Sequence, residues 1–282
     1  MKKIISLFVV LLSVLIIPTE SGLVRAQVIV APTILYLSSQ DQFGTFVVMN
    51  RSKDPQEIIV SFRFGYPTSD SLGNIFMQYD DSIAAQKYSC ADWLKGFPRQ
   101  FILNPGQQQV VRLTVRPQQG LPDGVYWTRL VTRSTPQVKF IDTVKTGVTA
   151  NITFVLEQVT TVIYEKGGIG TSVTVSNAGT FADSTHLNVI ARINRGGNAP
   201  FFGTVNLKVL DAAGNMVYTD KLLLAAYFSM NVKFSVPLSE LRVGDHYTAV
   251  LDLSSDRPDI PPENLIKVEP VEQKIPFSLG ER

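Results

Sequence analysis

The sequence predicts an all-β fold that consists of two β-sandwiches in tandem. Helical periodicity is scarce, and nearly every apolar segment is short, rich in β-branched residues and bounded by glycine, proline, asparagine or aspartate. Such closely spaced turn signals are typical of sandwiches. The chain of 282 residues is long enough for two domains of ordinary size. Cys90 is its single cysteine, so burial of apolar side chains has to hold each sandwich together without an internal disulfide.

Residues 1–26 have the pattern of a cleaved secretory signal peptide. Lys2 and Lys3 precede an apolar run from Ile4 to Ile17, and small residues lead to an expected cleavage after Ala26. The run is shorter than a membrane span of about 20 residues, and no later run is long enough, so we expect no membrane span. The sequence therefore predicts an exported, soluble protein, located in the periplasm or elsewhere outside the cytoplasm.

The charge balance excludes one class of partner. Removal of the signal peptide takes away three basic residues and one acidic residue, which cancels the excess of 26 basic over 24 acidic residues in the whole chain. No basic block remains, so we expect neither nucleic acid nor a charged membrane surface as a partner.

Residues 27–158 are expected to form the first sandwich, which is immunoglobulin-like because it has about seven strands. Pro32 interrupts the first of them, which suits an edge strand or a crossover between two sheets. Residues 51–55 indicate a hairpin turn, and residues 66–96 a long irregular loop with one strand near Asn74–Tyr79. The predicted strands are Val28–Ser38, Thr45–Asn50, Glu57–Phe64, Gln100–Asn104, Gln109–Val115, Val125–Thr132 and Val148–Leu156.

Residues 159–282 are expected to form the second sandwich, also immunoglobulin- or fibronectin-like. The glycine-rich stretch Glu165–Gly170 is its first flexible segment and is interpreted as a hinge or turn. Pro237–Val243 indicates a single helical turn. The predicted strands are Thr171–Asn177, His186–Asn194, Gly203–Leu210, Met216–Leu224, Met230–Val236, Tyr247–Leu253 and Leu265–Val271.

The sequence contains no recognisable catalytic or cofactor motif. Metal-ligand spacings of cysteine and histidine, phosphate loops and nucleophile elbows are all missing. The two histidines, His186 and His246, are interpreted as structural, and Cys90 as a buried thiol. We therefore expect a protein that is not an enzyme, with no catalytic residue, metal or cofactor.

Two other groups of residues have a functional and a structural interpretation. The adjacent carboxylates of Asp80 and Asp81 suit a cation, although such loop pairs are usually solvated. Trp93, Tyr126 and Trp127 suit a sugar-stacking surface, but their place on alternating segments favours packing in the core of the first sandwich.

The stretch Lys145–Tyr164 stands out by its length. Within it Ala150, Ile152, Phe154 and Leu156 share one face of an alternating pattern. A usual strand has about 5–6 residues, so one long strand would run between the domains or offer a free edge that another strand can join. The alternative is two ordinary strands that meet at Glu157–Gln158, one in each domain.

The first half resembles the PapD-like periplasmic chaperones of pilus assembly. Phe101–Pro117, FILNPGQQQVVRLTVRP, resembles the family signature L-x-P-G-x-x-x-x-V-R-L. Val28–Leu37, Gly44–Asn50 and Asn151–Tyr164 resemble further strands of the family, so that the resemblance covers Val28–Tyr164. It implies two immunoglobulin-like domains in a boomerang arrangement.

The resemblance also implies a function and a set of partners. The family's long strand lends alternate apolar side chains to an incomplete pilin-like subunit, so exported subunits are expected as partners, together with an usher or a cell-surface protein. The subunit-binding positions that it implies here are Ala150, Ile152, Phe154 and Leu156.

The sequence departs from the family at its carboxylate anchor. The family places an arginine and a lysine where this chain has Ile34 and Thr161, neither of which can form an ion pair. Cations that could substitute for the pair are Arg129, Arg133, Lys145 and Lys166.

The second half supports an alternative function. Ala199–Lys221 and Val236–Leu253 resemble a fibronectin-type module found in surface proteins that interact with WxL-domain proteins. Together with the altered anchor, this resemblance implies an adhesin-like surface-binding or scaffold protein without chaperone activity. The sequence leaves open the partner, the oligomeric state, and the choice between free periplasm and cell surface.

Overall fold

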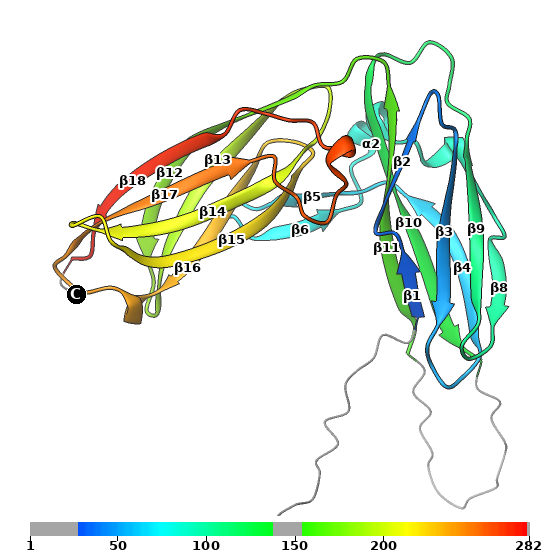
Figure 1. The fold of residues 1–282 in the computed structure, drawn as a ribbon, viewed down its shortest axis with the longest axis horizontal. Helices are drawn as coiled ribbons and strands as arrows, with labels where there is room; N and C mark the ends of the chain where they lie inside the picture. Colours follow the sequence, from blue (N-terminus) through cyan, green and yellow to red (C-terminus); the bar gives the residue numbers. More distant parts are fainter. Residues whose placement is uncertain (1–27, 138–153, 281–282) are drawn as a thin grey trace, which may run out of the picture.

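The computed structural model describes residues 28–137 and 154–280 and confirms the all-β fold of two sandwiches (Figure 1). The sandwiches meet at a bend, with the first on the right and the second on the left of Figure 1. The expected signal peptide, residues 1–26, lies outside the described residues. Within residues 28–137 and 154–280, no helix has the length and hydropathy needed to cross a membrane.

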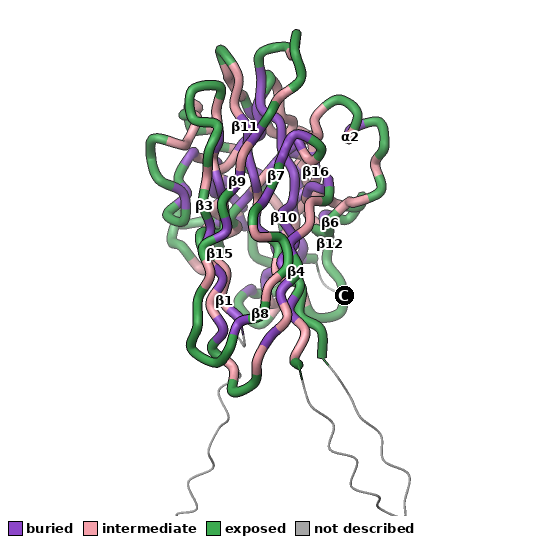
Figure 2. Tube along the Cα trace, turned by 90° about the vertical axis from the view of Figure 1, so that its right-hand side faces the viewer, coloured by how far each residue is buried: buried purple, intermediate pink, exposed green. Residues whose placement is uncertain are grey.

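Two sheets face each other in the first sandwich. One sheet has the order β1 (Val28–Ala31), β3 (Phe43–Asn50), β9 (Gln108–Val115) and β7 (Leu94–Phe97). The other has the order β2 (Ile34–Ser38), β11 (Leu156–Lys166), β10 (Gly124–Pro136), β4 (Gln56–Arg63) and β8 (Gln100–Leu103). Both contribute apolar side chains to one core, among them Phe46, Leu113 and Val162. In Figure 2 the central strand β10 is buried over most of its length.

The first strand changes sheets at Pro32, which is one of the two alternatives that the sequence left open. β1 pairs with β3 in one sheet, and β2 pairs with β11 in the other. The hairpin expected at residues 51–55 is wrong, because β3 and β4 lie in different sheets. Buried Asn50 holds this crossover, since its Nδ2 donates to the carbonyl oxygens of Asp54 and Leu103, both at 2.9 Å.

Residues 66–93 form an ordered insertion where a mostly irregular loop was expected. β5 (Tyr66–Ser69) and β6 (Ile75–Gln78) pair as a two-stranded sheet, which confirms the strand predicted near Asn74–Tyr79. A helix α2 (Ser82–Tyr88) and a 3-10 turn η1 (Ala91–Trp93) follow. The Asp81 carboxylate caps α2 by accepting from Ala84 N at 2.9 Å, so it serves the backbone.

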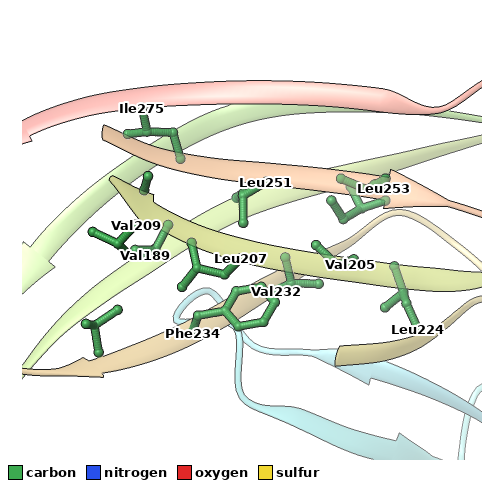
Figure 3. Packing of buried hydrophobic residues seen from close by; sticks show 14 of the residues in the cluster. Val189, Val205, Leu207, Val209, Leu224, Val232, Phe234, Leu251, Leu253 and Ile275 are labelled. Atoms are coloured by element: carbon green, nitrogen blue, oxygen red, sulfur yellow. The ribbon is translucent and has the colours of Figure 1, made fainter. Parts of the chain in front are cut away.

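The second sandwich also has two sheets around a single core. The first sheet has the order β12 (Thr171–Ala182), β13 (His186–Gly197) and β16 (Met230–Pro237). The second has the order β15 (Met216–Ala226), β14 (Phe201–Asp211), β17 (His246–Ser254) and β18 (Val271–Ser278). Figure 3 shows side chains of both sheets meeting between them, including Val189, Leu207, Phe234 and Leu251.

Two predictions for the end of the chain have different outcomes. The helical turn expected within Pro237–Val243 is confirmed as the 3-10 turn η2 (Leu238–Glu240). The strand expected at Leu265–Val271 is wrong, because a 3-10 turn η3 (Pro262–Asn264) and irregular backbone precede β18. Its apolar residues were assigned to a strand although Pro261, Pro262 and Pro270 restrict pairing there.

An aromatic cluster joins the two sandwiches. Trp127 of β10 is fully buried, and its ring centroid lies 4.7 Å from that of Tyr227 and 5.9 Å from that of Phe228, both in the second sandwich. The expected burial of Trp127 is confirmed, but it is buried at the interface between the sandwiches and not in the first core. Trp93 and Tyr126 lie in the first core, as predicted.

The connection between the sandwiches follows β11. The boundary expected after residue 158 falls inside β11, all of which pairs with β10 of the first sandwich. We propose that the boundary lies at residues 167–170 instead. Gly167 has a φ of +64°, and a side chain there would collide with the Asp123 carboxylate, so this turn requires glycine.

Candidate functional site

β11 runs from Leu156 to Lys166 and pairs with β10 along its whole length, so the segment after Glu157–Gln158 closes the first sandwich and not the second, as the alternative of two strands had it. The strand predicted from Lys145 is confirmed from Leu156 onward, while Phe154 and Val155 precede it without strand pairing. The predicted site residues Ala150 and Ile152 lie outside the described residues.

Among the described residues, strands flank β11 on both sides only along its second half. β10 pairs with it antiparallel over its whole length, from Leu156 to Lys166. β2 pairs with it in parallel on the other side, but only from Thr161 to Glu165. In the part of the chain that the structure describes, no strand covers this second side from residue 156 to residue 160. We call this segment the open edge.

The crossover at Pro32 explains why the edge is open. Because β1 pairs with β3 in the opposite sheet, the strand that covers the second half of β11 starts only at Ile34. Had residues 28–31 continued in line with β2, they would have covered the open edge as well. Because the first strand is divided into β1 and β2, which lie in different sheets, half of β11 stays available for pairing.

The backbone groups that face the open edge can be assigned from the covered half. Thr161 N donates to Thr33 O at 3.0 Å, and Glu165 O accepts from Ser39 N at 3.3 Å, so odd-numbered residues direct their peptide groups toward this side. Peptide groups alternate in direction along a strand. The N–H and C=O groups of Glu157 and Val159 therefore point out of the open edge, whereas those of Gln158 and Thr160 point to β10.

Apolar side chains surround the open edge. Phe154 is 74% exposed and Leu156 is 38% exposed. In the alternating pattern both fall on the same face as Val162, which points into the first core. On the opposite face, Val155 and Val159 are each 45% exposed. The sequence predicted Phe154 and Leu156 as site residues but missed the two valines. Glu157 lies between Val155 and Val159 on the opposite face, so that face shows no continuous apolar pattern.

Two polar side chains interrupt the inward face of the open edge. Thr160 is buried, and Oε1 of Gln158 is buried without a hydrogen-bond partner among the described residues. Sequence reasoning did not single out Gln158. The alternating pattern places Gln158 on the same face as Phe154 and Leu156. A polar residue on a face that was predicted to be apolar could have drawn attention to it.

The open edge ends beside a buried cation. Thr161 lies in register with Ile34, the two positions that the resemblance equated with the family's anchor. Arg129 of β10 pairs with Thr161, donates from Nη1 to Thr161 Oγ1 and from Nε to Gly65 O at 3.0 Å, and lies over the ring of Tyr227. No carboxylate among the described residues forms an ion pair with Arg129.

The other candidate substitutes lie elsewhere. Arg133 is opposite Glu157 on β10, and the ammonium group of Lys166 donates to Leu121 O at the far end of β11. Lys145 lies outside the described residues. Of the three candidates that the structure describes, Arg129 is thus the one that pairs with Thr161 at the end of the open edge.

The remaining candidate residues have structural surroundings. Cys90 is fully buried, which confirms the expected buried thiol, and burial raises the pKa of this thiol. His186 Nδ1 shares a hydrogen bond with Thr185 Oγ1 at 2.8 Å. Within residues 28–137 and 154–280, no group of three or more histidine, cysteine or acidic side chains is placed to hold a metal ion.

No model of a known protein family and no curated protein sequence matches the chain. Many solved structures match the chain, among them three that contain chaperones.

The YadV chaperone is 10% identical, with a TM-score of 0.49, and the match covers 88% of this chain and 100% of that one. A complex of the CsuC chaperone with the CsuE tip subunit from Acinetobacter baumannii Csu pili gives 12% identity and a TM-score of 0.42, covering 89% and 98%. The Salmonella enterica SafA pilin in complex with the SafB chaperone gives 11% identity and a TM-score of 0.41, covering 88% and 96%. At these values the similarity assigns neither a family nor a function.

Proposed function

We propose that this protein is a chaperone-like binding protein that captures an extended segment of another exported polypeptide as a strand along the open edge of β11. The single observation that carries the proposal is the one-sided pairing of residues 156–160. Partners of the pilin-like class, as the sequence resemblance implies, would act outside the cytoplasm after removal of the signal peptide. The proposed activity is binding and involves no catalytic step.

The open edge supplies both affinity and fit. The N–H and C=O groups of Glu157 and Val159 offer up to four hydrogen bonds to an added strand, each with a net contribution of about 0.5–1.5 kcal/mol. Burial of Phe154 against the partner would contribute roughly 1.5–3 kcal/mol, and burial of Leu156 less because it is only 38% exposed, before the cost of ordering the partner.

Arg129 is our proposal for the cation that replaces the family's anchor. It lies beside Thr161, where β2 closes the edge, and its charge has no acidic partner within the described residues. A partner strand that runs parallel to β11 would bring its terminal carboxylate to this end. Arg129, whose Nη1 now donates to Thr161 Oγ1, would exchange this hydrogen bond for one to the partner's carboxylate.

The test introduces negative charges in place of the apolar side chains at the open edge. The double variant Phe154→Asp and Leu156→Asp should abolish the binding of extended peptides that alternate apolar and polar residues, measured on an immobilised peptide panel. A matched control places the same change at Phe43 and Ile102, which are 70% and 53% exposed on β3 and β8. Equal binding by the edge variant and the control would contradict the proposal.

The alternative is the surface-binding or scaffold protein implied by the second half. It rests on the fibronectin-like segments and on the missing anchor pair at Ile34 and Thr161. Cell fractionation separates the two functions. Stable association with the cell surface that survives the Phe154→Asp and Leu156→Asp change favours the alternative, and free extracytoplasmic protein favours the chaperone-like function.

A further inference from the structure

Gln158 places a buried amide oxygen, which has no hydrogen-bond partner among the described residues, in the middle of the open edge. Its side chain points to the inside of the first sandwich, and its Oε1 is buried without a hydrogen-bond donor among the described residues. Its cross-strand partner Thr132 on β10 also has a buried hydroxyl oxygen without a partner in that part of the chain. Buried acceptors in native proteins are nearly always satisfied, so this pair requires an explanation.

We propose that Gln158 selects the partner by its sequence, an inference that rests on the proposed strand addition. The added strand carries a hydrogen-bonding side chain, of the serine, threonine, asparagine or glutamine class, at the position next to Gln158. Side chains at directly adjacent positions of neighbouring strands lie about 4.5–5.5 Å apart, which brings such a donor within reach of Oε1.

The surroundings of Gln158 define the rest of the pattern. Leu156 and Phe154 precede it on the same face and are apolar, so the partner's residues next to them are apolar too. An apolar residue next to Gln158 would leave this buried amide oxygen without a hydrogen bond. A site that buries a polar group strongly rejects partners without a matching hydrogen-bonding group. An apolar pocket rejects a partner of slightly different size less strongly.

The experiment compares threonine with valine, which have nearly the same shape. Peptides that alternate apolar and polar residues are made with threonine or valine at each inward position in turn, and binding is followed by protection of the Glu157 and Val159 amides. At one position the wild type should bind the threonine peptide about tenfold more tightly, which corresponds to about 1.4 kcal/mol. The Gln158→Leu variant should prefer the valine peptide at that same position.

The control is Thr132→Val, which removes the other unpartnered oxygen one strand further in. It should leave the threonine preference unchanged, and Gln158→Met serves as a second variant if Gln158→Leu lowers the unfolding midpoint. Loss of the preference in Thr132→Val would show that a water bridges the two groups, which overturns the inference.

The remaining outcomes separate the inference from the proposed function. If peptides protect the two amides without any preference for threonine, or if Gln158→Leu keeps the preference, selection by Gln158 is wrong and strand addition stands. If no peptide of the panel protects these amides, both are wrong.

Discussion

Thr161 on β11 lies in parallel register with Ile34 on β2, and this pair marks the point at which the second edge of β11 closes. On one side of the pair β11 is a central strand, and on the other side it is an edge strand. The two residues are also those that the sequence resemblance equated with the family's anchor. Neither residue carries a charge, and Arg129 of β10 pairs with Thr161 at this point.

Replacement of Val159 by proline tests the assignment of the open edge without any partner. Because the Val159 N–H points out of the edge, Val159→Pro removes no hydrogen bond to β10 and should leave the unfolding midpoint in urea nearly unchanged. Thr160→Pro is the matched control, since it removes an N–H that faces β10 and should lower the midpoint clearly. Equal destabilisation by the two variants would contradict the assignment.

Gly167→Ala should destabilise the connection between the sandwiches. The residue has a φ of +64°, and an added Cβ would meet the Asp123 carboxylate. We expect a loss of stability on the order of 1–3 kcal/mol in urea unfolding. Gly170→Ala is the control, because it has a permissive φ and nothing within 4 Å of an added Cβ among the described residues. A neutral Gly167→Ala would show that the turn rearranges easily.

Trp127→Ala should lower the stability of the protein and make the two sandwiches unfold separately. The side chain is fully buried and packs on Tyr88, Tyr227 and Phe64. Truncation of such a residue costs about 3–5 kcal/mol, and the loss is measured by urea unfolding monitored by circular dichroism. Because the cluster joins the sandwiches, we also expect two transitions in place of one. A single transition with a loss below about 1 kcal/mol would contradict this role.

Glu165→Gln should change the dependence of stability on pH. Glu165 lines the same small cavity as Tyr36, Phe202 and Ile266 at the interface, and burial raises the pKa of its carboxyl group above the ordinary value. A raised carboxyl pKa means that the folded state resists ionisation, so stability is lost as pH rises through the ordinary glutamate range. The variant should be more stable than wild type at neutral pH and equal to it at low pH. The opposite order at neutral pH would show that the carboxylate has a stabilising partner.

The fold could be predicted largely because strands leave a local signature. Alternation located β3, β4 and β9 to within a few residues. The assignment of strands to sheets is not local, however, and this is why residues 51–55 were taken for a hairpin. The turn residues there report only a reversal of direction, and the side chain of Asn50, which fixes the crossover, makes its contact with Leu103 far along the chain.

The site was predictable in part for the same reason. Phe154 and Leu156 stood out because their alternation is visible in the sequence. Gln158 did not, because a polar residue in a strand usually faces solvent, and only the position of β10 shows that its oxygen is buried. The extent of the open edge depends on where β2 begins, and that follows from the pairing of β1 with β3.

Amide hydrogen exchange along β11 tests the central claim most directly. In the free protein, the amides of Gln158 and Thr160 should exchange slowly because they face β10, and those of Glu157 and Val159 should exchange fast because they face the open edge. Addition of a bound peptide strand should slow Glu157 and Val159 specifically. Slow exchange of Glu157 and Val159 in the free monomer, or fast exchange that persists in the complex, would contradict capture by strand addition.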